Sequence, residues 1–73
     1  MQVEKVYIKL VSVTHKEWFP YLEEFRNLHN CQVFCDKDTY WCLTNQEGYE
    51  KLEQIQRFFE LQSKTIIIKK GGL

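Results

Sequence analysis

Two segments of the chain, THKEWFPYLEEFRNL (residues 14–28) and TNQEGYEKLEQIQRF (residues 44–58), carry one pattern of side chains at an offset of 30 residues. Seven aligned positions match in type: Thr14 with Thr44, Glu17 with Glu47, Phe19 with Tyr49, Leu22 with Leu52, Glu23 with Glu53, Phe25 with Ile55, and Leu28 with Phe58. Internal repetition of this kind indicates that one structural unit occurs twice in the fold. We therefore expect two equivalent halves.

Both segments begin with Thr-x-x-Glu, which is typical of a helix start. The hydroxyl of Thr14 or Thr44 accepts a hydrogen bond from an N–H of the first turn, and the glutamate reaches back to the N–H of the cap. Apolar residues then recur at helical spacing, so each helix has one apolar stripe. The stripes are Trp18, Leu22, Phe25 and Leu28 in the first helix, and Leu52, Ile55 and Phe59 in the second. Pro20 removes one backbone hydrogen bond, and we expect a kink or a fresh start near Phe19.

A strand is predicted before and after each helix, over residues 3–13, 31–35, 39–43 and 64–70, because these segments are rich in β-formers or alternate in polarity. The order strand, helix, strand then occurs twice. This order resembles the ferredoxin-like βαββαβ plait, which implies an α+β fold with a four-stranded antiparallel sheet in the order 4-1-3-2 and both helices on one face. We expect residues 1–73 to form a single domain of this type. Because many unrelated functions use this fold, it indicates no function by itself.

The segment CQVFCDKDTYWC (residues 31–42) is predicted to form the hairpin between the halves. Its polar run DKDT can turn the chain, with Asp36 or Asp38 accepting hydrogen bonds from local backbone N–H groups. An even turn that pairs Cys35 with Tyr40 sends alternate side chains to opposite faces. One face then holds Cys31, Val33, Cys35, Tyr40 and Cys42, and the other holds Phe34, Trp41 and Leu43. A one-residue bulge would exchange the two faces.

The first strand adds a second set of side chains to each face. It places Val6, Ile8 and Leu10 on one face and Lys5, Tyr7 and Lys9 on the other. If the helices cover the cysteine face, the uncovered face is aromatic and also carries Ile67, which normally marks a binding surface or an oligomer interface. We predict partner contacts through Lys5, Tyr7, Lys9, Phe34 and Trp41, with the rings as anchors and the lysines as a polar rim. In the reversed register, Trp41 would be core, and Tyr40 and the cysteines would occupy the open face.

The three cysteines fit neither a metal site nor a redox site well. Zinc takes four N or S ligands, whereas Cys-x3-Cys here lies along a strand and the fourth ligand would have to be His15 or His29. A redox thiol needs a cationic surrounding or a helix N-terminus, and a bridge from Cys31 or Cys35 to Cys42 would be at the edge of disulfide geometry. We interpret the thiols as small apolar core groups, and we expect no metal and no cofactor.

Composition restricts the class of protein. The 73 residues are 44% apolar and contain ten basic and ten acidic residues, so the net charge is zero. A core of this size is marginal by itself, which favours an oligomer or a bound partner. A neutral chain lacks the field that captures nucleic acid or anionic membranes, so nucleic acid is disfavoured and no membrane contact is expected. The odd cysteine count and the charged N-terminal segment predict a soluble, cytoplasmic protein.

No catalytic arrangement is recognisable, and we expect a protein without enzymatic activity. His15 and His29 lie near predicted helix ends and are interpreted as surface residues. The carboxylates on the predicted helices are interpreted as solvent-facing charge: Glu23, Glu24, Glu50 and Glu53. Gly71 and Gly72 follow the last strand and do not form a phosphate loop.

The favoured hypothesis is a small accessory protein that forms a homodimer, docks on a larger protein, or does both, for example as an inhibitor of a host enzyme. One alternative is a single-stranded nucleic-acid binder, because aromatic and lysine side chains on a sheet are similar in general form to an RRM. Another alternative comes from LEQIQRFF (residues 52–59), which resembles the sliding-clamp-binding motif Gln-x-x-aliphatic-x-x-aromatic-aromatic. Ile55, Phe58 and Phe59 match that motif, and Leu52 replaces its glutamine.

Overall fold

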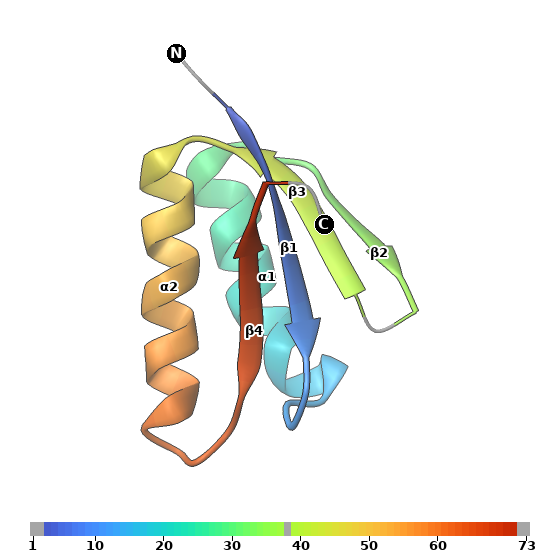
Figure 1. The fold of residues 1–73 in the computed structure, drawn as a ribbon, viewed down its shortest axis with the longest axis vertical. Coiled ribbons are helices and arrows are strands. Elements are labelled where there is room, and N and C mark those ends of the chain that lie inside the picture. Colours follow the sequence, from blue (N-terminus) through green and yellow to red (C-terminus); the bar gives the residue numbers. More distant parts are fainter. Residues whose placement is uncertain (1–2, 38, 72–73) are drawn as a thin grey trace.

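The computed structural model describes residues 3–37 and 39–71 of the chain. Its elements are β1 (Glu4–Leu10), α1 (His15–His29), β2 (Val33–Asp36), β3 (Thr39–Thr44), α2 (Gln46–Glu60) and β4 (Ile66–Lys70). The strands form one antiparallel sheet in the order β2-β3-β1-β4, and both helices lie on the same side of it (Figure 1). The predicted α+β architecture, with four antiparallel strands and two helices, is therefore confirmed.

The hairpin of β2 and β3 has the predicted register. The paired residues are Val33 with Cys42, Phe34 with Trp41, Cys35 with Tyr40, and Asp36 with Thr39. Lys37 follows β2 with a positive φ of 60°, and Asp38, one of the two predicted turn residues, lies outside the described residues. Because Cys42 is fully buried and Phe34 is exposed, the alternative with exchanged faces is wrong.

The core lies between the helices and one face of the sheet. Val6, Ile8 and Leu10 project from β1 into this layer, as the alternation of that strand predicts. The apolar stripes of both helices meet them there with Trp18, Leu22, Phe25, Leu52, Ile55 and Phe59. Leu28, which was placed on the first stripe, is 63% exposed because the stripe ends one turn earlier. The helices thus cover one face of the sheet.

Helix α1 begins at the predicted cap. Thr14 accepts from the N–H of Glu17, and the Glu17 carboxylate accepts from the N–H of Thr14, which completes the capping box. Lys64, in the loop before β4, forms an ion pair with the same carboxylate. Pro20 lies inside one continuous helix, so the predicted fresh start near Phe19 is wrong. Pro20 is exposed, so water can satisfy the carbonyl that lost its partner.

Helix α2 begins one residue later than predicted. Thr44 is the last residue of β3 and is buried, and the cap is Asn45, whose side chain accepts from the N–H of Gly48. A Cβ built at Gly48 would lie 1.8 Å from the Oγ1 of Thr44. The close approach of helix and strand therefore requires glycine at this position, and it keeps the Thr44 side chain in the core instead of at the cap.

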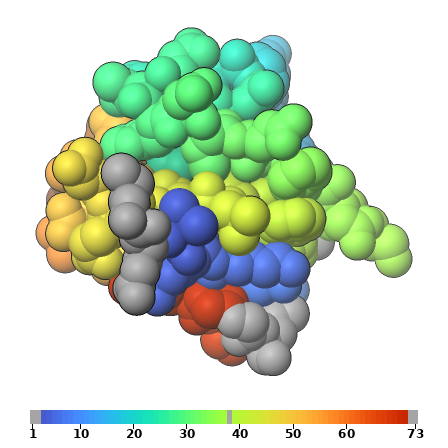
Figure 2. Space-filling model, turned by 90° about the horizontal axis from the view of Figure 1, so that it is seen from above, coloured from blue at the N-terminus to red at the C-terminus, as the bar shows by residue number. Residues whose placement is uncertain are grey.

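The hairpin of β2 and β3 extends past the helices. Figure 1 places it at the edge of the sheet away from α2, and Figure 2 shows this segment projecting from the body of the molecule. Cys35 lies on the same face as Cys42 but is exposed, whereas its register partner Tyr40 is buried beside Trp18 of α1. At this position α1 therefore covers β3 but not the edge strand β2. Within residues 3–37 and 39–71, neither helix has the length and apolar character needed to cross a membrane.

Candidate functional site

The face of the sheet opposite the helices is the candidate site, and we call it the open face. It consists of the side chains that alternate with the buried ones along each strand. The open face comprises Lys5, Tyr7, Lys9, Phe34, Asp36, Thr39, Trp41, Leu43, Ile67 and Lys69. No helix or strand among the described residues covers it, and Leu43 and Ile67 are about half exposed, at 53% and 47%.

Four of the five predicted contact residues touch one another. The rings of Phe34 and Trp41 stack with centroids 4.3 Å apart and planes 21° apart. The ammonium of Lys5 lies 4.4 Å from the centroid of Trp41 and 5.1 Å from that of Tyr7. Tyr7 is the register partner of Trp41, so the three rings form one row across β2, β3 and β1. These contacts hold the rings in place on the surface.

Lys9, the fifth predicted residue, lies apart from this row and borders a hollow. The hollow has a volume of about 320 Å³ and is lined by Tyr7, Lys9, Thr39, Ile67 and Lys69. Lys69 is the register partner of Tyr7, and Ile67 is the partner of Lys9. The hollow therefore has an aromatic and an aliphatic wall, with one ammonium group on each of two neighbouring strands.

Sequence reasoning missed Lys69 and Thr39. In the segment IIIKK (residues 66–70), isoleucine occupies consecutive positions and so points to both faces of the sheet. The pattern of this segment alone therefore does not show which face is buried. The available signal was Ile67, which is already assigned to the uncovered face, because Lys69 lies two positions further along the strand and must share that face.

The thiols differ in burial and in acidity. Cys42 is fully buried, and burial raises the pKa of its thiol to about 12. Cys31 is half-buried, burial raises its pKa as well, and its Sγ donates to the carbonyl of Leu43 over 3.0 Å. Cys35 is exposed. The interpretation as apolar core is therefore right for Cys42, partly right for Cys31 and wrong for Cys35.

The two histidines lie at opposite ends of α1. His15 is exposed, and its Nδ1 lies 2.5 Å from the hydroxyl of Tyr40, whose pKa burial raises to about 12. The ring of His29 lies against Phe25 with centroids 5.3 Å apart. Among residues 3–37 and 39–71, no group of three or more His, Cys, Asp or Glu side chains is arranged to hold a metal ion. Both histidines thus contact aromatic residues.

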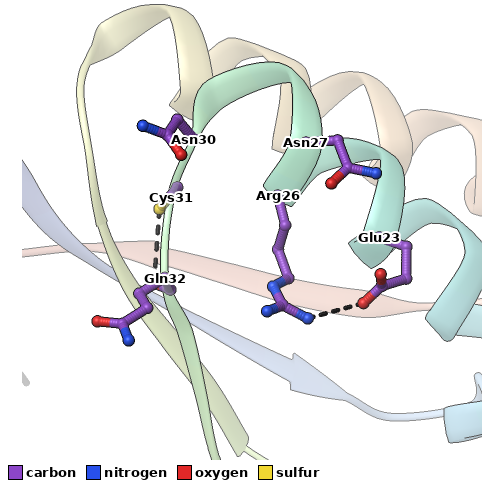
Figure 3. Close-up of a pocket in the computed structure, with 6 residues that line it drawn as sticks. All are labelled: Glu23, Arg26, Asn27, Asn30, Cys31 and Gln32. Atoms are coloured by element: carbon purple, nitrogen blue, oxygen red, sulfur yellow. Dashed lines mark hydrogen bonds and ion pairs between the residues drawn. The ribbon is translucent and has the colours of Figure 1, made fainter.

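A larger hollow, of about 530 Å³, lies at the C-terminal end of α1 (Figure 3). Its lining is mostly polar and includes Arg26, Asn27, Asn30 and Cys31. Arg26 is already paired with Glu23, with Nη1 and Oε1 2.7 Å apart. Among the described residues that line it, there is thus no unpaired cation and no large apolar side chain, and this hollow is a weaker candidate than the open face.

Residues 52–59, which resemble the sliding-clamp-binding motif, are part of α2. Leu52, Ile55 and Phe59 are buried in the core, and only Phe58 is substantially exposed, at 44%. Phe58 packs on Tyr21 of α1, with ring centroids 5.3 Å apart. In this fold, a clamp could reach only one of the motif's apolar side chains.

Comparisons with protein-family models, with curated proteins and with solved structures found no match to this chain.

Proposed function

We propose that the chain is a small, non-enzymatic protein-binding module that acts through its open face, and that its single domain is a ferredoxin-like plait. The observation that carries this proposal is the row of Phe34, Trp41 and Tyr7 on the uncovered side of the sheet. Its partner is a larger protein, a second copy, or both.

The row has the properties of binding anchors. A few residues supply most of the energy at protein interfaces, and tryptophan and tyrosine are enriched among them. Their contribution is larger when neighbouring groups fix them before binding. Here Trp41 is held between Phe34 from β2 and Lys5 from β1. Leu43 and Ile67 extend the apolar area on either side, and Lys9 and Lys69 supply a charged rim. An apolar face of this kind on so small a chain is expected to be covered in the functional state.

A single-stranded nucleic acid is the second candidate. It is favoured by Tyr7 and Trp41, which lie side by side on the two central strands, where a sheet presents rings to bases. Base stacking needs an accessible ring face, however, and Trp41 is flanked by Phe34 on one side of its strand and by Lys5 on the other. This arrangement favours a protein partner.

The test compares Trp41→Ala with Phe19→Ala. Phe19 is a matched control because it is an aromatic residue on α1 that is 57% exposed. We expect Trp41→Ala to abolish the capture of specific proteins from a lysate of the source cells, or a dimer seen by light scattering, with unchanged helical circular dichroism. Phe19→Ala should retain both. Equal capture and equal mass for all three proteins would contradict the proposal.

A further inference from the structure

The charges of this neutral chain are not evenly distributed. The ion pairs among the described residues involve Arg26, Lys51, Lys64 and Lys70, each with a glutamate, and all lie outside the open face. Lys5, Lys9 and Lys69 of the open face take part in none of them. Asp36, at the end of β2, is the acidic residue assigned to that face among the described residues. The open face therefore has a positive field although the net charge is zero.

This distribution disfavours face-to-face pairing of two copies. In such a dimer, the same surface of each chain contacts the other, so the three lysines of both copies would lie in one partly dehydrated interface. Like charges gathered in this way reduce affinity. A partner with acidic residues would instead place opposite charges against Lys9 and Lys69.

The hollow beside Lys9 indicates which chemical groups the partner should carry. Its volume of about 320 Å³ is close to the lower limit for small-ligand pockets, so it suits one or two side chains. Tyr7 and Ile67 offer apolar contact, while Lys9 and Lys69 offer ammonium groups. Carboxylate groups bound by these lysines would form charge-assisted hydrogen bonds.

We propose that the open face binds an acidic segment of a different protein, in which carboxylates contact Lys9 and Lys69 and a neighbouring apolar or aromatic side chain enters the hollow between Tyr7 and Ile67. The inference rests on the proposed function and adds the chemistry of the partner. According to this inference, Lys9 and Lys69 select the partner by its charge.

The test uses a random copolymer of glutamate and tyrosine as the probe, at an ionic strength of about 0.15 M so that only close charges contribute. A chain of 8.9 kDa is well suited to NMR, and its two indole N–H signals are internal reporters. Trp41 lies on the open face, whereas Trp18 is fully buried. We expect the copolymer to shift the Trp41 signal and to leave the Trp18 signal in place. A copolymer of lysine and tyrosine should shift neither.

Charge reversal then tests the role of the two lysines. Lys9→Glu/Lys69→Glu should weaken binding of the acidic copolymer by at least about tenfold. The matched control, Lys16→Glu/Arg57→Glu, changes the net charge equally at exposed helix positions and should alter binding by less than about twofold. If the charge-reversed variant does not fold, Lys9→Gln/Lys69→Gln with the corresponding glutamine control makes the same comparison.

The outcomes separate the inference from the proposed function. Equal weakening by the variant and its control would overturn the inference, as would binding of both copolymers alike. Stronger binding of oligothymidylate than of the acidic copolymer at Trp41 would overturn it in favour of nucleic acid. Shielding of Trp41 by self-association would overturn it in favour of a dimer and would leave the open face as the site. Signal changes confined to the helices would overturn both proposals.

Discussion

Trp18 and Trp41 lie on opposite sides of one sheet, and their surroundings differ as the two faces differ. Trp18 is fully buried beneath α1, and Trp41 is half-buried on the face that no described element covers. Both faces carry apolar side chains, but this chain has only two helices in the part that the structure describes, and both lie on one side. One face therefore stabilises the fold, and the other is the face that we propose a partner covers.

The largest expected difference is in stability. Trp18→Ala should cost about 3–5 kcal/mol because it leaves a cavity in the core. This loss is comparable with the whole stability of a domain of this size, about 3–5 kcal/mol. Trp41→Ala should cost only about 1 kcal/mol, since it removes one stacked pair and one cation–π contact. Urea unfolding should show a shifted cooperative transition for Trp41→Ala and little or no folded baseline for Trp18→Ala. Similar transitions for the two variants would contradict the division of the faces.

The thiols extend the comparison to chemical reactivity. We expect iodoacetamide to modify Cys35 first, Cys31 more slowly, and Cys42 only when the domain unfolds. Exposure decides the rate at Cys35, whereas burial raises the pKa of Cys31 and of Cys42 and so reduces their thiolate fraction. Mass spectrometry of peptides after timed labelling determines the order. Early modification of Cys42 in the folded protein would show that the reagent can reach the core between the helices and the sheet.

Gly48 tests how closely the covered face is packed. Helix propensity alone predicts that Gly48→Ala stabilises α2 by about 1 kcal/mol. The new Cβ would collide with Oγ1 of Thr44, so we expect a net loss of about 1–3 kcal/mol. In a Thr44→Ala background the loss should become smaller. A stabilised Gly48→Ala single variant would show that the strand and helix can separate without cost.

The smallest expected effect is an acid dependence at Glu17. Hydrogen bonding to Lys64, and then to the N–H of Thr14, lowers the pKa of Glu17 to about 2. A carboxyl group with a lowered folded-state pKa adds stability above its unfolded pKa, about 4.5, and this contribution is lost as the pH falls towards 2. Thermal unfolding of wild type and Glu17→Gln should therefore differ at pH 6 and converge near pH 2. A constant difference at all pH values would contradict this assignment.

Sequence reasoning predicted the hairpin well because its evidence was local. Strand alternation and an even turn determine that Phe34 and Trp41 share a face, and both rings are found stacked. The first capping box was also predicted correctly, since Thr14 and Glu17 interact across a single turn. These features depend on residues that are close in sequence or paired directly.

The incorrect predictions concern contacts that depend on tertiary packing. Thr44 matches Thr14 in the repeat, but it packs against Gly48, and Asn45 becomes the cap. Cys35 alternates along its strand like a core residue, yet it is exposed because it lies on the edge strand β2, whereas α1 covers its partner Tyr40 on β3. Neither the extent of helix cover nor the spacing between helix and strand is present in the alternation pattern.

Fluorescence quenching tests the central claim, that Trp41 lies on an uncovered and positively charged face, without any partner. We predict that iodide quenches the wild-type protein more strongly than caesium does when each is expressed relative to its quenching of free N-acetyltryptophanamide, because Lys5, Lys9 and Lys69 attract the anion. We also predict that most quenching disappears in Trp41→Phe, since Trp18 is fully buried. Equal relative quenching by the two ions, or full iodide quenching in Trp41→Phe, would contradict the account.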